Sequence, residues 1–166
     1  MDDERREAEL VEVEGNNGAS YLSLPDSSVS KRNIKHSIQT VLLSDILQAI
    51  KVASNPKKLI MKIDIELYEC RAILGSQDIF NNVHKFQITA IIMEWMFILK
   101  DGTFTKECPR EKLMSMVGLF LKAGYVPLNI KDLSQLNYSN FGAEWRPNVL
   151  WIRNRTDSII KLRNLK

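Results

Sequence analysis

Two apolar, strand-like runs, each leading into a carboxylate, most constrain the fold of this 166-residue chain. Residues 58–63 lead to Asp64, and residues 88–93 lead to Glu94. Strands that are apolar along their whole length are typical of parallel sheets covered on both faces. Because a helical pattern separates the two runs, the sequence predicts an α/β fold in which these strands are neighbours.

The rest of the chain predicts further elements around this pair of strands. They are strands at 10–14 and 19–24 joined by the turn Gly15-Asn16-Asn17-Gly18, a strand at 37–42, a helix capped by Ser44 and ending near Ala53, a helix from about Glu66 to Gly75, a helix from Pro109 to near Gly124, and strands at 125–128 and 149–152. The three tryptophans, Trp95, Trp145 and Trp151, are expected in the core or in the wall of a pocket rather than as a stacking platform.

Composition narrows the classes of function. A formal net charge of +3, with bases that do not alternate with aromatic residues, does not favour nucleic-acid binding. The first residues are acidic rather than a secretory signal, and no apolar run is long enough to cross a bilayer, so the sequence predicts a cytoplasmic protein without a membrane segment. Cys70 and Cys108 are far apart along the chain and predict neither a disulfide framework nor a zinc site.

The carboxylates at the strand ends are the candidate site residues. Ligands of open α/β sheets bind beyond the carboxyl ends of the strands, where Asp64 and Glu94 fall and where Glu66 lies within reach. Such carboxylates hold a hydroxyl, accept its proton or bind a cation. Two structural alternatives remain open: Asp64 caps the following helix, or Glu94 is a polar residue satisfied at a strand end.

The stretch Lys62-Ile63-Asp64-Ile65-Glu66-Leu67-Tyr68-Glu69-Cys70 resembles the motif of FkbM-type methyltransferases, in which a strand ends in a Lys-Ile-Asp-Val-Glu-Gly-like sequence. Residues 40–47, 91–95 and 145–152 resemble the segments that precede and follow this motif in the family. The resemblance covers about residues 38–153. It implies a partial Rossmann-like sheet, mostly parallel with a C-terminal antiparallel strand pair. The segment before this domain (1–37) is acidic and then forms a hairpin and a loop. The segment after it (154–166) is a basic tail.

The resemblance implies methyl transfer from S-adenosylmethionine to an oxygen of a small molecule or glycan, with Asp64, Glu66 and Glu94 acting on the acceptor. Two departures weaken that function. Leu67 stands where the family has glycine, and no strand with a Gly-rich cofactor loop precedes residue 38, so the first half of the nucleotide-binding sheet is missing and cofactor-binding residues stay unassigned.

Two alternatives follow from these departures. One is a truncated, non-catalytic product, in which a protein partner or a second copy covers the open sheet. The other is a hydrolase or phosphoryl-transfer enzyme that uses a divalent cation. That alternative lacks a Gly-Lys-Ser/Thr phosphate loop.

Overall fold

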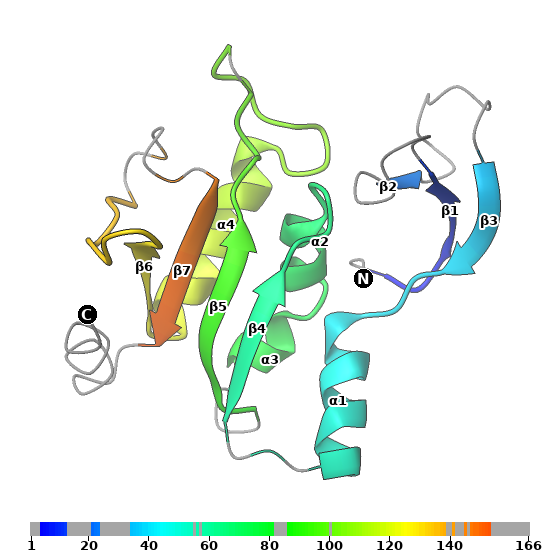
Figure 1. Ribbon diagram of the computed structural model, residues 1–166, viewed down its shortest axis with the longest axis horizontal. Helices are drawn as coiled ribbons and strands as arrows, with labels where there is room; N and C mark the ends of the chain where they lie inside the picture. The colour runs from blue at the N-terminus through cyan, green and yellow to red at the C-terminus, as the bar shows by residue number, and fades with distance from the viewer. Residues whose placement is uncertain are drawn as a thin grey trace.

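The computed structural model describes residues 4–12, 21–23, 34–54, 56, 58–81, 86–99, 101–138, 141, 145 and 147–153. In these residues the chain forms an α/β fold with two sheets and four helices (Figure 1). The elements are β1 (Glu7–Val11), β2 (Tyr21–Ser23), β3 (Ile34–Gln39), α1 (Leu43–Ser54), β4 (Leu59–Ile63), α2 (Glu69–Leu74), α3 (Gln77–Asn81), β5 (Ile88–Glu94), α4 (Arg110–Lys122), β6 (Tyr125–Asn129) and β7 (Asn148–Arg153).

The larger sheet has four strands in the order β4-β5-β7-β6. β4 and β5 are parallel neighbours, as predicted. β7 is antiparallel to both β5 and β6, so three strands run in one direction and one runs against them. The closing antiparallel pair that the sequence predicts is therefore confirmed. The sheet is mixed, and among the described residues β4 is one of its edges.

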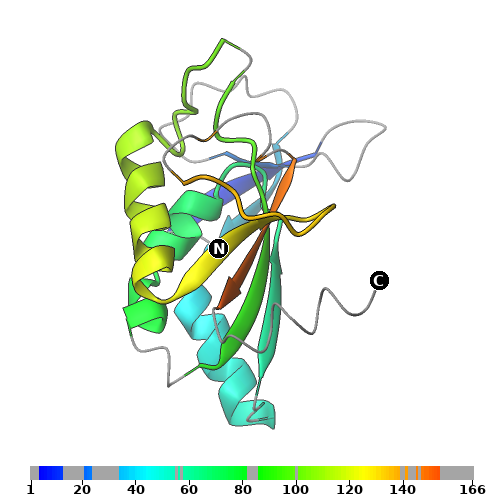
Figure 2. The ribbon, with the colours of Figure 1, turned by 90° about the vertical axis from the view of Figure 1, so that its left-hand side faces the viewer.

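The helices cover one face of this sheet rather than both. α2, α3 and α4 lie together behind the strands, and the turned view shows them on a single side (Figure 2). The described residues place no helix on the opposite face, so the prediction of a sheet covered on both faces is wrong. The exposure of β4 reflects this: Ile63 is buried on the helix side, whereas Ile60 on the other face is 72% exposed. A side chain with such exposure contributes little to the hydrophobic core.

Aromatic side chains fill the space between the sheet and α4. Trp95, Trp145 and Trp151 are fully buried in mutual ring contact, as the sequence predicts. α4 contributes Phe120, whose ring centroid lies 4.7 Å from that of Trp151. None of the described residues accepts a hydrogen bond from the three indole N–H groups, so these rings are held by packing rather than by polar contacts.

The smaller sheet has the strand order β2-β1-β3 and is antiparallel throughout. The antiparallel pairing of β1 with β2 agrees with the predicted N-terminal hairpin, but β1 begins three residues before the strand predicted at 10–14. The Gly/Asn turn lies outside the described residues. The strand predicted at 37–42 is shifted, because β3 ends at Gln39 and belongs to this small sheet. Thr40 is buried after it, and its hydroxyl donates to the carbonyl oxygen of Glu4 at 2.9 Å, which fixes the end of the strand.

Ser44 does not cap α1, contrary to the prediction. The carboxylate of Asp45 accepts the hydrogen bond from the Leu42 N–H at 3.1 Å, and the helix begins at Leu43, two residues earlier than a cap at Ser44 would place it. The backbone N–H of Ser44 instead donates to the hydroxyl of Ser76 at 3.0 Å. The same Asp45 carboxylate pairs with Arg5, whose Nη2 lies 2.6 Å from its Oδ1, and so joins α1 to the segment before β1.

The helix predicted from Glu66 begins later. α2 starts at Glu69, and Glu66 and Leu67 both have positive φ angles, which a right-handed helix excludes. Gly75 ends α2, as predicted, and the short helix α3, which the sequence pattern did not predict, follows almost at once.

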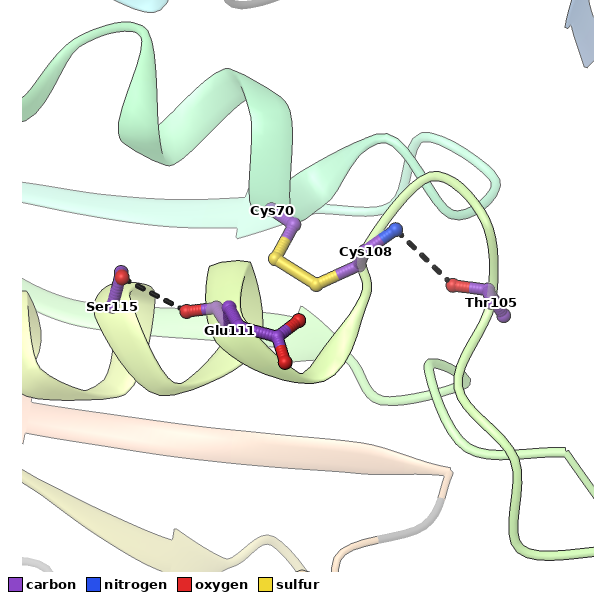
Figure 3. Close-up of a disulfide and its surroundings, with 5 residues drawn as sticks. All are labelled: Cys70, Thr105, Cys108, Glu111 and Ser115. Atoms are coloured by element: carbon purple, nitrogen blue, oxygen red, sulfur yellow. Dashed lines mark hydrogen bonds between the residues drawn. A yellow bond between two sulfur atoms is a disulfide. The ribbon is translucent and has the colours of Figure 1, made fainter.

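A disulfide joins Cys70 and Cys108, whose Cα atoms are 5.6 Å apart. Figure 3 shows Cys70 at the start of α2 facing Cys108, which lies in the loop before α4. The Cys108 N–H donates to the Thr105 hydroxyl at 3.3 Å, which fixes this loop locally. The sequence interpretation, which treated the two thiols as unlinked, is wrong because the fold brings together residues 38 positions apart.

Candidate functional site

Three carboxylates gather at the carboxyl ends of the two parallel strands. Carboxylate oxygens of Asp64, Glu66 and Glu94 lie within 4.8 Å of one another, and we call this group the acid cluster. Asp64 directly follows β4, and Glu94 is the last residue of β5. The parallel pairing of these strands brings their ends to one edge of the sheet. The structure thus brings together all three candidate residues that the sequence suggested.

The acid cluster is close to solvent, and Lys62 is a cationic neighbour of it in the described part of the chain. Asp64 and Glu66 are exposed, whereas Glu94 is half-buried. Lys62 Nζ lies 2.6 Å from the Asp64 carboxylate, and this hydrogen bond, with the charge of Asp64, raises the pKa of Lys62. Partial burial raises the pKa of Glu94, and the negative charges of Asp64 and Glu66 raise it further. Glu94 therefore holds a proton more readily than an isolated glutamate.

The turn between β4 and α2 carries two members of the acid cluster. Glu66 has φ 52° and Leu67 has φ 76°, so two consecutive non-glycine residues adopt the left-handed conformation. Asp64 does not cap α2, because Tyr68 occupies the N-cap position and no side chain caps the helix there. The capping alternative for Asp64 is therefore wrong. Leu67, which stands where the FkbM-type motif has glycine, adopts a conformation that favours glycine.

Glu69 is a buried carboxyl group beside this turn that the sequence did not single out as a site residue. It is 1% exposed, and its Oε1 accepts a hydrogen bond from the Ile65 N–H at 2.9 Å. Burial raises the pKa of Glu69 to about 7, and the charges of Glu94 and Asp64 act in the same direction. The sequence offered one signal for this residue. Glu69 is the third acid of the run Asp64-x-Glu66-x-x-Glu69, and no Lys or Arg lies three or four positions away to form an ion pair on a helix.

The small sheet packs against the same turn from the other side. Ala8 of β1 and Tyr68 are both buried and form a small apolar cluster. Ile38 and Ile65 pack against it, and Ile65 also contacts the main core. The N-terminal segment is thus part of the surroundings of the acid cluster, which the sequence did not predict.

The chemistry available to this arrangement follows from its residue types. Exposed carboxylates accept hydrogen bonds from a substrate hydroxyl, and a carboxyl group with a raised pKa, as Glu94 has, is a stronger base than an isolated carboxylate. The oxygen spacing also lets one cation contact all three carboxylates. A separate hollow of about 460 Å³ lies at the opposite end of the sheet, lined by Phe80, Asn81, Lys122, Ala123, Gly124 and Arg153, and includes no member of the acid cluster.

The described residues do not fit S-adenosylmethionine, the cofactor that the resemblance implies. A nucleotide-type cofactor needs a turn whose backbone approaches it closely, normally at glycine. In the described ranges the glycines with positive φ are Gly102, in the loop after β5, and Gly124, at the end of the sheet away from the acid cluster. Gly15 and Gly18 fall between β1 and β2 of the small sheet and lie outside the described residues.

Comparison with models of known protein families, with curated proteins and with solved structures found no match. Within the described ranges, none of the helices combines the length and apolar character needed to cross a bilayer.

Proposed function

We propose that this chain takes part in methyl transfer from S-adenosylmethionine to an oxygen of a small molecule or glycan. In this proposal the acid cluster binds and deprotonates the acceptor hydroxyl. The cofactor is bound by residues other than those the structure describes. The observation that carries the proposal is the meeting of Asp64, Glu66 and Glu94 at the carboxyl ends of β4 and β5, within 4.8 Å of one another.

The direction of the strands also supports the proposal. A partial Rossmann-like methyltransferase sheet that is mostly parallel and closes with an antiparallel pair is what the resemblance to FkbM-type methyltransferases implies. The observed order β4-β5-β7-β6, with only β7 reversed, is compatible with it.

Each acidic residue has a distinct role in the proposal. Glu94 accepts the proton of the acceptor hydroxyl, because it is the half-buried member of the acid cluster and has a raised pKa. Asp64, held by Lys62 at 2.6 Å, accepts a hydrogen bond from the same or a neighbouring hydroxyl and orients the acceptor. Glu66 supports both through its charge.

The test measures the transfer of a labelled methyl group from S-adenosylmethionine to a panel of glycosides and small alcohols. Glu94→Gln should lower the rate by about 10²–10⁴-fold, the usual contribution of a general base. Asp64→Asn should lower it as well. The affinity for S-adenosylhomocysteine, measured by calorimetry, should stay unchanged in both variants because they act on the acceptor. Asp101→Asn, an exposed acid in the loop after β5, serves as the control.

A second candidate function is favoured by the open edge of the sheet. If the folded chain neither binds S-adenosylhomocysteine nor transfers methyl groups, it does not carry out methyl transfer by itself. A non-catalytic product that depends on a partner, or on a second copy, would then account for the exposed Ile60 on β4. A metal-dependent hydrolase ranks last, and a phosphatase assay with magnesium tests it.

The cytoplasmic location stays a prediction, and one structural observation counts against it. The Cys70–Cys108 disulfide belongs to a class of bond that forms and persists in oxidising compartments. We therefore expect the folded chain to be isolated with this bond intact only when it is produced under oxidising conditions.

A further inference from the structure

Glu69 lies where it can control the shape of the acid cluster. It is the first residue of α2, and its carboxyl group reaches back across the turn to the N–H of Ile65. A backbone hydrogen bond within the turn runs from the Tyr68 N–H to the Ile65 carbonyl oxygen at 3.3 Å, which is long. The contact between Glu69 and Ile65, at 2.9 Å, is the shorter of the two.

The turn needs such support because its backbone conformation is unfavourable. Glu66 and Leu67 both adopt positive φ angles. For a residue with a side chain, the left-handed conformation costs about 1–2 kcal/mol. Two such residues in a row persist only where the surrounding structure holds them. The buried carboxyl group of Glu69 can hold the turn in this conformation, because losing its hydrogen bond to the Ile65 N–H would leave a buried polar group without that partner.

We propose that Glu69 is a positioning residue of the acid cluster: its hydrogen bond to the Ile65 N–H holds the left-handed turn that keeps Asp64 and Glu66 beside Glu94. Glu69 does not contact the acceptor in this arrangement, because it is almost fully buried. A role of Glu69 in catalysis rests on the proposed function. Its role in holding the turn does not depend on that function.

The experiment follows the carboxyl group of Glu94 by carbon-13 NMR titration in the full chain. Its pKa reports the distance to Asp64 and Glu66, whose charges help to raise it. Glu69→Gln removes the titrating carboxyl group of Glu69 but keeps an oxygen that can accept from the Ile65 N–H. Glu69→Leu removes both the carboxyl group and the acceptor. The comparison between these two variants therefore isolates the hydrogen bond.

The expected result is a lower pKa for Glu94 in Glu69→Leu than in Glu69→Gln, together with at least tenfold faster hydrogen exchange of the Ile65 amide. Glu69→Asp keeps the charge but is one methylene shorter, and it should shift both readouts in the same direction as Glu69→Leu. It also replaces Glu69→Leu if that variant does not fold. An unchanged pKa for Glu94 and unchanged exchange at Ile65 in the folded variants would overturn the proposal.

This titration needs neither cofactor nor acceptor. Its failure would therefore leave the proposed methyl transfer standing, and a failed transfer assay would leave the positioning role of Glu69 standing.

Discussion

Cys70, in the first turn of α2, is bonded to Cys108, in the loop directly before α4, so the two helices that pack behind the sheet are covalently linked (Figure 3). Both cysteines are fully buried. Cys70 is also the residue after Glu69, so the disulfide anchors the end of the turn that carries the acid cluster.

We expect loss of this disulfide to lower the free energy of unfolding by about 4 kcal/mol, the loop-entropy value for a separation of 38 residues. The double variant Cys70→Ala/Cys108→Ala, compared with the oxidised chain in urea denaturation, measures it. The oxidised chain in reducing buffer should approach the double variant. An equal midpoint for the two proteins would show that the bond contributes no stability.

Leu67→Gly is expected to keep or raise the free energy of unfolding, by up to about 1 kcal/mol. Leu67 has φ 76°, a conformation that strains a side chain but not glycine. The gain is limited by the greater flexibility of glycine in the unfolded chain. The control is Leu119→Gly, at a half-buried position inside α4, which should lose well over about 1 kcal/mol. Chemical denaturation of both variants tests the prediction, and an equal loss in both would contradict it.

Glu69 should make the stability of the protein fall as pH rises from about 4.5 to about 7. Burial raises its pKa from 4.5 to about 7 in the folded chain, so in this interval the folded state retains a proton that the unfolded state has lost. The stabilisation is complete below the lower value and is lost as pH rises through the upper one, with a total of roughly 3 kcal/mol.

Urea denaturation at several pH values tests this dependence. Glu69→Gln does not titrate, so its stability should change less over the same interval. Glu111→Gln, at an exposed position in α4, should keep the dependence of the unmodified chain. If the free energy of unfolding changed equally with pH in the unmodified chain and in Glu69→Gln, the pKa of Glu69 would not be raised.

Tyr125→Phe is expected to lower the free energy of unfolding by about 1–3 kcal/mol, because it leaves a buried carbonyl group without its donor. The Tyr125 hydroxyl donates to the Ile88 carbonyl oxygen at 2.8 Å, and burial raises its pKa to about 12. This contact lies at the start of β5, whereas Glu94 ends that strand. The variant should therefore leave the pKa of Glu94 unchanged, and a shift there would reveal coupling along the sheet.

Ile60→Lys should reduce self-association of the chain while changing its stability by less than about 0.5 kcal/mol. Ile60 is 72% exposed on β4, the strand at the sheet edge. Val52→Lys on α1, where Val52 is 78% exposed, is the matched control for added charge. Light scattering over a concentration series compares the three proteins. Equal association of both variants would show that β4 is not the surface involved.

Local sequence patterns predicted the parts of the fold that depend on local preferences. The apolar runs before Asp64 and Glu94 were enough to place β4 and β5, and the amphipathic spacing of residues 113–121 placed α4. The position of the two acids at strand ends also followed from the pattern, because the end of an apolar run is a local signal.

Where local signals competed, the patterns gave wrong boundaries. Ser44 has the character of an N-cap, but Asp45 binds the Leu42 N–H and moves the start of α1. Glu66 and Leu67 have good helix propensity, yet the turn places both at positive φ. Helix propensity is worth less than about 1 kcal/mol per residue, so a side chain–backbone hydrogen bond such as the one between Glu69 and the Ile65 N–H can outweigh it.

The sequence by itself determined an α/β chain with two apolar strands and carboxylates at their ends, since each depends on a pattern along a short segment. The antiparallel closing pair was expected from the resemblance to FkbM-type methyltransferases. Tertiary structure alone decided that Cys70 meets Cys108, that the helices gather on one face, and that Glu69 is buried beneath the turn. These relationships join residues through packing across the fold. A periodic pattern along one segment does not determine which distant segment will pack against it.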